Sequence, residues 1–187
     1  MAVSAVSICN RALQRLSASR ITSLTQDHPN ARNCNVAYDP VRRALLRAYA
    51  WNFAKKEASV AVDATTTTID SLNRYLLPND YIRLIRDPDN RVDWQIRGRY
   101  IITADSSPLQ YWYVRDEDDP GVFDPLFAEA FGCKIAYEIC EAVTGSLDKR
   151  KLLLVDYKEI IASARQMNAF ERDADQLLED DFILAMY

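Results

Sequence analysis

The sequence predicts an α+β protein, mainly an α-helical bundle with a small antiparallel β-domain inserted in it. Apolar side chains recur every three or four residues in the first and last thirds of the 187-residue chain, whereas the middle consists of short β-branched and aromatic runs separated by turn residues. The expected boundaries are 1–54 and 123–170 for the helical bundle, 55–122 for the β-domain and 171–187 for an acidic segment with an apolar end.

Amphipathic helices are expected over most of the first third. Helical spacing of apolar residues extends from about Ser4 to Leu16 and again over 30–38. Asp39 followed by Pro40 is typical of an N-cap and the first helical position, so a helix is expected to begin there, either abutting the previous one or as the second half of a kinked helix. Its buried stripe is expected to comprise Val41, Ala44, Leu45, Ala48 and Tyr49.

The middle of the chain predicts one small antiparallel sheet. Short strands are expected at 58–62, 81–85, 92–96, 99–103 and 109–114. The clearest hairpin turns at Gly98.

Two further helices are expected in the last third. Asp124 and Pro125 repeat the cap pattern, and Gly145 suits the left-handed position after the helix end. The helix between them is apolar around a narrow polar stripe, so it must be covered from more than one direction. The last helix starts at about Ser146, and its apolar face is expected to contain Leu153, Tyr157, Ile160, Ile161, Ala164 and Met167.

Scarce residue types exclude several kinds of chemistry. Four dispersed glycines cannot build the familiar phosphate cradles, and a single histidine, His28, excludes two-histidine metal sites. The four cysteines lie among aliphatic residues without C-x-x-C spacing, so buried free thiols are expected. No run of 18 apolar residues occurs, and no secretion or membrane-insertion segment is expected.

The remaining candidate groups favour structural roles. The acids at 116–119 are consecutive and therefore diverge, His28 and Cys34 lack further partners, and the aromatic run 111–113 is followed at once by acids that would repel phosphate. No catalytic residue, metal ligand or cofactor is predicted.

Charge is unevenly distributed along the chain. Residues 1–56 hold nine basic and two acidic side chains, a net charge of +7, whereas 171–181 holds six acidic and one basic side chain, a net charge of −5. This polarity suggests either solvated helix faces, a basic face toward an acidic partner, or head-to-tail contact between copies.

The last six residues of the sequence are almost entirely apolar and follow the acidic run directly. Either they pack back on their own bundle, or they dock on another subunit or protein. For the second case, the expected partner-binding residues are Leu177, Leu178, Phe182, Ile183, Leu184, Met186 and Tyr187.

Several segments together resemble the tail tubular protein A-like head-to-tail connector family of short-tailed and related bacteriophages. They cover most of residues 8–165: Ala12-Leu13-Gln14-Arg15-Leu16, Ile21-Thr22-Ser23-Leu24, Ala31-Arg32-Asn33-Cys34, Tyr38-Asp39-Pro40-Val41-Arg42, Ala44-Leu45-Leu46-Arg47, Trp51-Asn52-Phe53-Ala54, Leu77-Pro78-Asn79-Asp80 and Phe123-Asp124-Pro125-Leu126-Phe127. The chain departs from the family pattern at 63–76 and beyond about 170.

The resemblance implies a helical bundle with an inserted β-domain and a non-enzymatic virion protein. Such a protein forms a ring, usually of twelve copies, between the portal and the tail nozzle or tube. Genomic DNA passes through the ring without sequence recognition. The resemblance places the protein in the virion neck and, during assembly, in the host cytoplasm, with no membrane partner.

In such a ring, charge contacts between protomers are expected to join Arg42, Arg43 and Arg47 to Glu179, Asp180 and Asp181. Two alternatives from other classes remain open. A small nucleic-acid-binding module would use the basic first third, and a carboxylate-dependent hydrolase would use Asp116 or Asp118.

Overall fold

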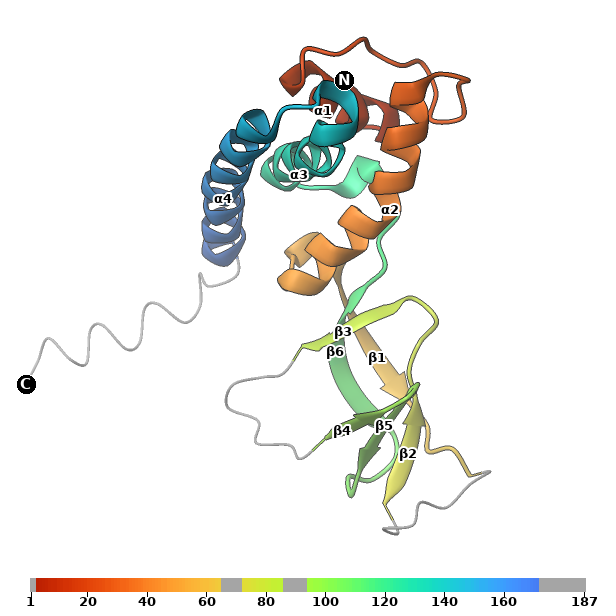
Figure 1. Ribbon diagram of the computed structural model, residues 1–187. Helices are drawn as coiled ribbons and strands as arrows, with labels where there is room; N and C mark the ends of the chain where they lie inside the picture. The colour runs from red at the N-terminus through yellow and green to blue at the C-terminus, as the bar shows by residue number, and fades with distance from the viewer. Residues whose placement is uncertain (1–2, 65–71, 86–93, 172–187) are drawn as a thin grey trace, which may run out of the picture. The chain divides into compact units, whose positions relative to one another are not determined.

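The computed structural model describes residues 3–64, 72–85 and 94–171. These residues form four α-helices and two small three-stranded antiparallel sheets, which confirms the predicted α+β class (Figure 1). The chain divides into two compact units. The helical unit contains the chain up to residue 45, residues 51–53 and the chain from residue 118, and the β-rich unit contains 46–50 and 54–117.

The helices are α1 Ala5–Arg15, α2 Pro29–Ala48, α3 Pro125–Thr144 and α4 Leu147–Phe170, with 3₁₀ turns η1 Asn52–Ala54 and η2 Pro120–Val122. Both ends of α3 have capping residues that suit the backbone groups left unpaired at a helix terminus. Asp124 accepts hydrogen bonds from the backbone N–H groups of Leu126 and Phe127 at 2.8 and 3.0 Å. Gly145 ends α3 with φ of 65°, as predicted.

Of the two arrangements expected at Asp39, the single long helix is correct and the N-cap role of Asp39 is not, because α2 runs through Asp39 and Pro40. A proline inside a helix removes one backbone hydrogen bond, here the bond to the carbonyl of Val36. Val36 is 75% exposed, so water reaches this turn and can hydrate the carbonyl. The predicted stripe also needs correction, since Val41 and Leu45 are buried whereas Ala44 and Ala48 are exposed.

Helix α3 lies at the centre of the helical unit, packed against α1 and α4 (Figure 1). Its buried residues are Phe127, Ala130, Phe131, Gly132, Cys133, Ile135, Ala136, Ile139 and Cys140. The prediction that this helix is covered from more than one direction is therefore confirmed, and the cover comes from the same chain.

Helix α4 buries a narrower face than expected. Leu153, Ile161 and Ala164 are buried as predicted, but Met167 is 52% exposed. Asn168 is buried in its place, because its side-chain and backbone oxygens accept hydrogen bonds from Asn52 at 2.7 and 2.8 Å.

The β-rich unit contains two sheets instead of the single sheet predicted. Their strand orders are β1-β6-β3 and β2-β5-β4, and the strands are β1 Lys55–Val60, β2 Asn73–Leu76, β3 Tyr81–Ile85, β4 Gln95–Arg97, β5 Tyr100–Thr103 and β6 Leu109–Arg115. Strand β2 was not predicted, and β1 begins three residues before the expected 58–62. Of the strand expected at 92–96, residues 92 and 93 lie outside the described residues.

Alternation along the strands gives the β-rich unit its own core. Tyr111 and Tyr113 are buried among aliphatic residues of both sheets, whereas Trp112 between them points outward and is 52% exposed. Burial raises the pKa of Tyr111 to about 12. Gly98, with φ of 62°, makes the predicted β4–β5 hairpin turn.

Removal of the α3 cap should lower stability measurably. We expect Asp124→Ala to reduce the free energy of unfolding by about 1 kcal/mol, because two backbone N–H groups lose their acceptor. Urea denaturation followed by circular dichroism measures this. Asp118→Ala, the same change at an exposed position, should stay within about 0.5 kcal/mol of wild type. Equal effects of the two changes would contradict the capping role.

Candidate interaction surfaces

The candidate catalytic groups have structural contacts. The Nδ1 atom of His28 accepts a hydrogen bond from the backbone N–H of Asn30 at 3.2 Å, and Asp119 caps η2 through Gly121 at 2.8 Å. Glu117 is buried and paired with Arg115, whereas Asp118 is exposed. Within residues 3–64, 72–85 and 94–171, no three His, Cys, Asp or Glu side chains are placed to hold a metal ion.

The four cysteines are buried and form no disulfide, as predicted. Cys9 on α1 and Cys34 on α2 have no exposed surface. The hydrogen bond to Cys34, together with burial, raises the pKa of Cys9, so this thiol stays protonated. A buried, protonated thiol is not a nucleophile that a substrate could reach.

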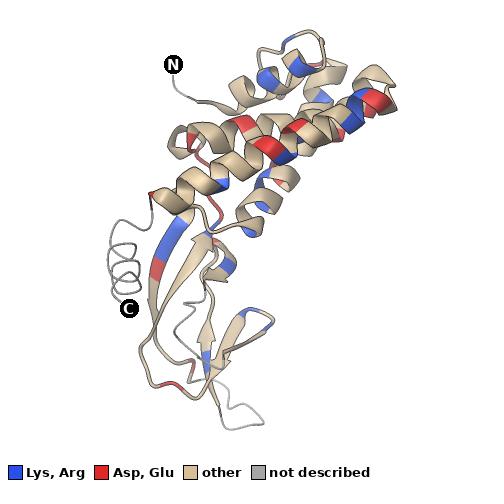
Figure 2. Cartoon of the chain, turned by 90° about the vertical axis from the view of Figure 1, so that its left-hand side faces the viewer, with Lys and Arg blue, Asp and Glu red and all other residues tan. Residues whose placement is uncertain are grey.

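Arginines of the first third are largely engaged within the chain. Arg11 and Arg15 on α1 both pair with Glu129 of α3, and Arg15 also lies 3.5 Å from Asp156 of α4. Arg32 pairs with Asp27 at 2.6 Å. Figure 2 shows acidic as well as basic positions on the helical unit. The net charge of +7 in the sequence therefore overstates the positive field of this region.

The three arginines expected to contact a neighbouring protomer have different surroundings. Arg42 is only 5% exposed and its Nε lies 3.3 Å from Asp39, so it offers little surface to a partner. Arg47 is exposed but donates a hydrogen bond to the carbonyl of Ile82 at 2.8 Å. Arg43 is exposed on α2. Their expected acidic partners at 179–181 and the apolar residues at 177–187 lie outside the described residues.

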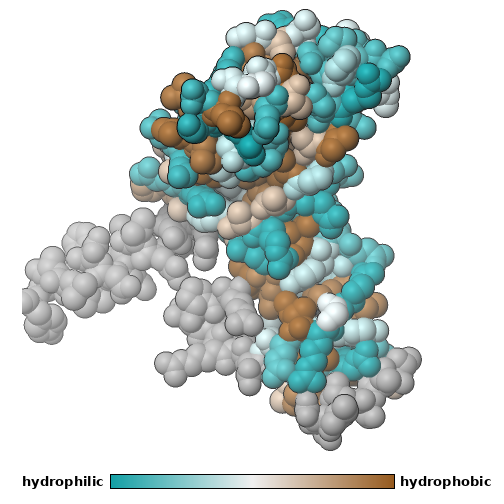
Figure 3. Space-filling view, viewed as in Figure 1, coloured by the Kyte–Doolittle hydropathy of each residue, from teal (hydrophilic) through white to brown (hydrophobic). Residues whose placement is uncertain are grey.

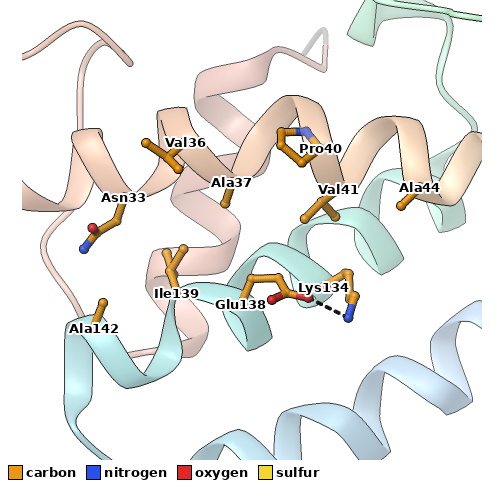
Figure 4. A pocket seen from close by; sticks show the side chains of 10 residues that line it. All are labelled: Asn33, Val36, Ala37, Pro40, Val41, Ala44, Lys134, Glu138, Ile139 and Ala142. Atoms are coloured by element: carbon orange, nitrogen blue, oxygen red, sulfur yellow. Dashed lines mark ion pairs between the residues drawn. The ribbon is translucent and has the colours of Figure 1, made fainter.

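A groove between α2 and α3 is the largest feature that the sequence analysis missed. It has a volume of about 540 Å³, within the range typical of binding pockets. Its walls are mostly apolar and come from one stripe on each helix (Figure 4): Asn33, Val36, Ala37, Pro40, Val41 and Ala44 on α2, and Lys134, Glu138, Ile139 and Ala142 on α3.

The groove has a polar edge on its α3 side. Lys134 and Glu138 form an ion pair of 2.8 Å, one helical turn apart. Lys134 also lies over the rings of Tyr137 and Tyr157, at 4.4 and 5.6 Å from their centroids. The position of Lys134 is thus fixed by α4 as well as by α3. The spacing of Val36, Ala37, Pro40, Val41 and Ala44 along one helix was the sequence pattern that could have revealed this groove.

A scan against models of known protein families gives no match, and a search of curated protein sequences gives none either. Among the described residues, no helix is both long and apolar enough to span a membrane.

The ion pairs of Glu129 should make folding stability depend on pH. Burial raises the pKa of this carboxyl, but hydrogen bonds from Arg15 and Arg11 outweigh burial and hold it below its ordinary value of 4.5. A lowered folded-state pKa contributes stability above about pH 4.5 that is lost as the pH falls below it. In Glu129→Gln we expect a shallower loss of stability between pH 5 and about pH 3, measured by urea titrations at each pH.

The matched control for this change is Glu159→Gln on the exposed face of α4. It should keep the pH dependence of the wild type. A Glu129→Gln profile parallel to that of the wild type would show that the arginine contacts do not stabilise the folded state.

Proposed function

We propose that the chain is a structural virion protein, a head-to-tail connector that assembles as a ring between a phage portal and the tail. The observation that supports this most directly is the order of the two units. The β-rich unit follows α2 and precedes α3, so the helical unit is interrupted as the family resemblance implies. The ring would extend the DNA channel, with passage of DNA independent of its sequence.

Two segments that carry the resemblance, 51–54 and 123–127, lie before and after the strands of the β-rich unit in sequence, and their aromatic residues pack together in the helical unit. The rings of Phe53 and Phe123 lie 5.6 Å apart, and both contact Phe127, at 4.9 and 5.1 Å. Trp51 meets Phe127 edge to face at 5.0 Å and donates a hydrogen bond to the carbonyl of Leu45. This aromatic cluster therefore joins, within the helical unit, the segments that precede and follow the strands of the β-rich unit.

The partners in this proposal are the portal protein, a tail component and further copies of the chain. Segment 171–187 is the docking arm for the portal or for a neighbouring copy. Between copies, Arg43 and Arg47 have exposed side chains, whereas Arg42 is buried within its own chain. Their acidic counterparts are Glu179, Asp180 and Asp181.

Electron microscopy with a portal tests the function directly. The chain is co-expressed with the portal protein encoded in the same genome, and we expect a ring stacked on the portal. A chain truncated after residue 170 should keep its far-UV circular dichroism but should be missing from the portal, because the docking arm is lost. Absence of any full-length ring on the portal contradicts the function, whereas a truncated ring that still docks contradicts the role of the arm.

Charge exchange tests the expected contact between copies. Arg43→Glu should raise the concentration for half-assembly about 1.4- to 5-fold, since exposed ion pairs contribute about 0.2–1 kcal/mol each. Adding Asp180→Arg should restore assembly. Mass photometry across a salt series measures both effects.

Lys158→Glu on the exposed face of α4 is the control for charge reversal and should leave assembly unchanged. If Arg43→Glu assembles like the control at every salt concentration, the proposed charge contact does not exist.

A further inference from the structure

Helix α2 has a second apolar face that no described segment covers. Its first face is buried in the helical unit through Ala31, Cys34, Tyr38 and Leu45. The second lines the groove, where Val36 is 75% exposed and Ala44 is exposed. Hydrophobic side chains gather at several places on the surface of the helical unit (Figure 3), but this stripe also lines a hollow. An apolar stripe along a hollow is typical of a docking surface.

We infer that the groove between α2 and α3 binds the apolar stretch 182–187 of a second copy of the chain. This inference rests on the proposed function, because it requires that several copies of the chain assemble. The stretch supplies large apolar side chains at Phe182, Ile183, Leu184, Met186 and Tyr187. A groove between two helices that takes an apolar segment is a recurring mode of peptide recognition.

Charge supports this occupant over an unrelated apolar segment. Helix α2 has three exposed arginines, Arg32, Arg43 and Arg47, of which Arg32 pairs with Asp27, whereas Arg42 is buried beside Asp39. The run 171–181, directly before the apolar stretch, has a net charge of −5. Complementary charge beside an apolar contact steers association and fixes its register. The acidic run would lie along α2 while the apolar stretch enters the groove.

The chain length allows this arrangement. Helix α4 is described to its C-cap Glu171, and ten residues separate that point from Phe182. Ten residues span at most about 35 Å, roughly the length of α4 itself. This distance exceeds the separation of about 8–10 Å between packed helices, so the stretch can reach a neighbouring copy.

The geometry of α3 favours a second copy over the same copy. Asn168, near the end of α4, bonds to Asn52, and the adjacent Phe53 contacts Phe123 and Phe127 at the start of α3. The α3 wall of the groove, however, runs from Lys134 to Ala142. Within one copy, the acidic run would have to turn back along about 20 Å of α3, which uses more than half of its maximum reach of about 35 Å.

Site-specific cross-linking of the full-length protein tests this inference. A photo-reactive phenylalanine analogue replaces Ala37 in the groove, and ¹⁵N-labelled and unlabelled chains are mixed before assembly. Trypsin cuts after Arg32, Arg42 and Arg172, so the groove and the apolar stretch are released as peptides 33–42 and 173–187. We expect cross-links between these two peptides, about half of them joining a labelled to an unlabelled chain.

The result decides between the possible occupants. Cross-links found only within chains of one label place the stretch in its own groove and overturn the inference. Cross-links from the groove to other peptides, or no cross-link to 173–187 at any concentration, overturn it as well.

Substitutions give a second, independent measurement. Val36→Asp and Leu184→Asp should each weaken self-association at least tenfold, because each places a charge in an apolar contact. Val155→Asp, the same change at a 53% exposed position of α4, is the matched control and should associate like wild type. Circular dichroism verifies that all three fold. Association of Val36→Asp equal to that of the control overturns the inference.

Failure of this inference and failure of the proposed function give different results. If full-length rings stack on the portal but the cross-links avoid the groove, only the docking site is wrong. If mixed-label cross-links reach the groove but no ring joins the portal, the contact between copies stands and the connector function fails.

Discussion

Helix α3 is apolar on almost every side, and the rest of the helical unit is arranged to keep it from water. Helices α1 and α4 pack against it, and Gly132 allows α1 to come so close that a Cβ there would lie 3.3 Å from the carbonyl oxygen of Ile8. Trp51, just before η1, and Phe53 within it pack against Phe127 in the first turn of α3. Glu129, at the edge of this contact, draws Arg11 and Arg15 of α1 toward α3. Helix α3 thus has apolar neighbours along most of its length and charged neighbours at Glu129.

This arrangement changes how the charge of the chain is understood. In the sequence, the first third appears strongly basic and resembles a surface for an acidic partner. In the folded chain, Arg11 and Arg15 join α1 to α3 through Glu129, and Arg32 pairs with Asp27. Arg43 and Arg47 of α2 are exposed, whereas Arg42 is buried. An acidic partner therefore meets a smaller basic surface than the charge of the sequence suggests.

Caps and turns, which depend on neighbouring residues, were predictable from the sequence. Features that depend on contacts between distant residues were not. Asp124, Gly145 and Gly98 act through their own backbone neighbourhood, so their patterns alone indicate a cap, a helix end and a hairpin turn. Pro40 is also common at a helix start, and nothing nearby in sequence reveals that α2 continues through it. The burial of Asn168 instead of Met167 depends on Asn52, 116 residues away. The groove could be predicted only in part, because its α2 stripe follows helical spacing while its α3 wall depends on how the two helices meet.

The structure also changes which helix offers apolar surface for a contact between copies. From the sequence, α3 was expected to be covered from more than one direction. The structure shows that α1, α4 and the aromatic cluster cover α3 within the chain. Exposed apolar side chains of the helical unit lie on α4, at Leu147, Leu152, Val155, Met167 and Phe170, and on α2 at Val36. The continuation of α2 through Pro40 places Val36, Ala37, Val41 and Ala44 on one wall of the groove. Two helices abutting at Asp39 would have divided this stripe between them, so the continuation of α2 through Pro40 forms the α2 wall of the groove.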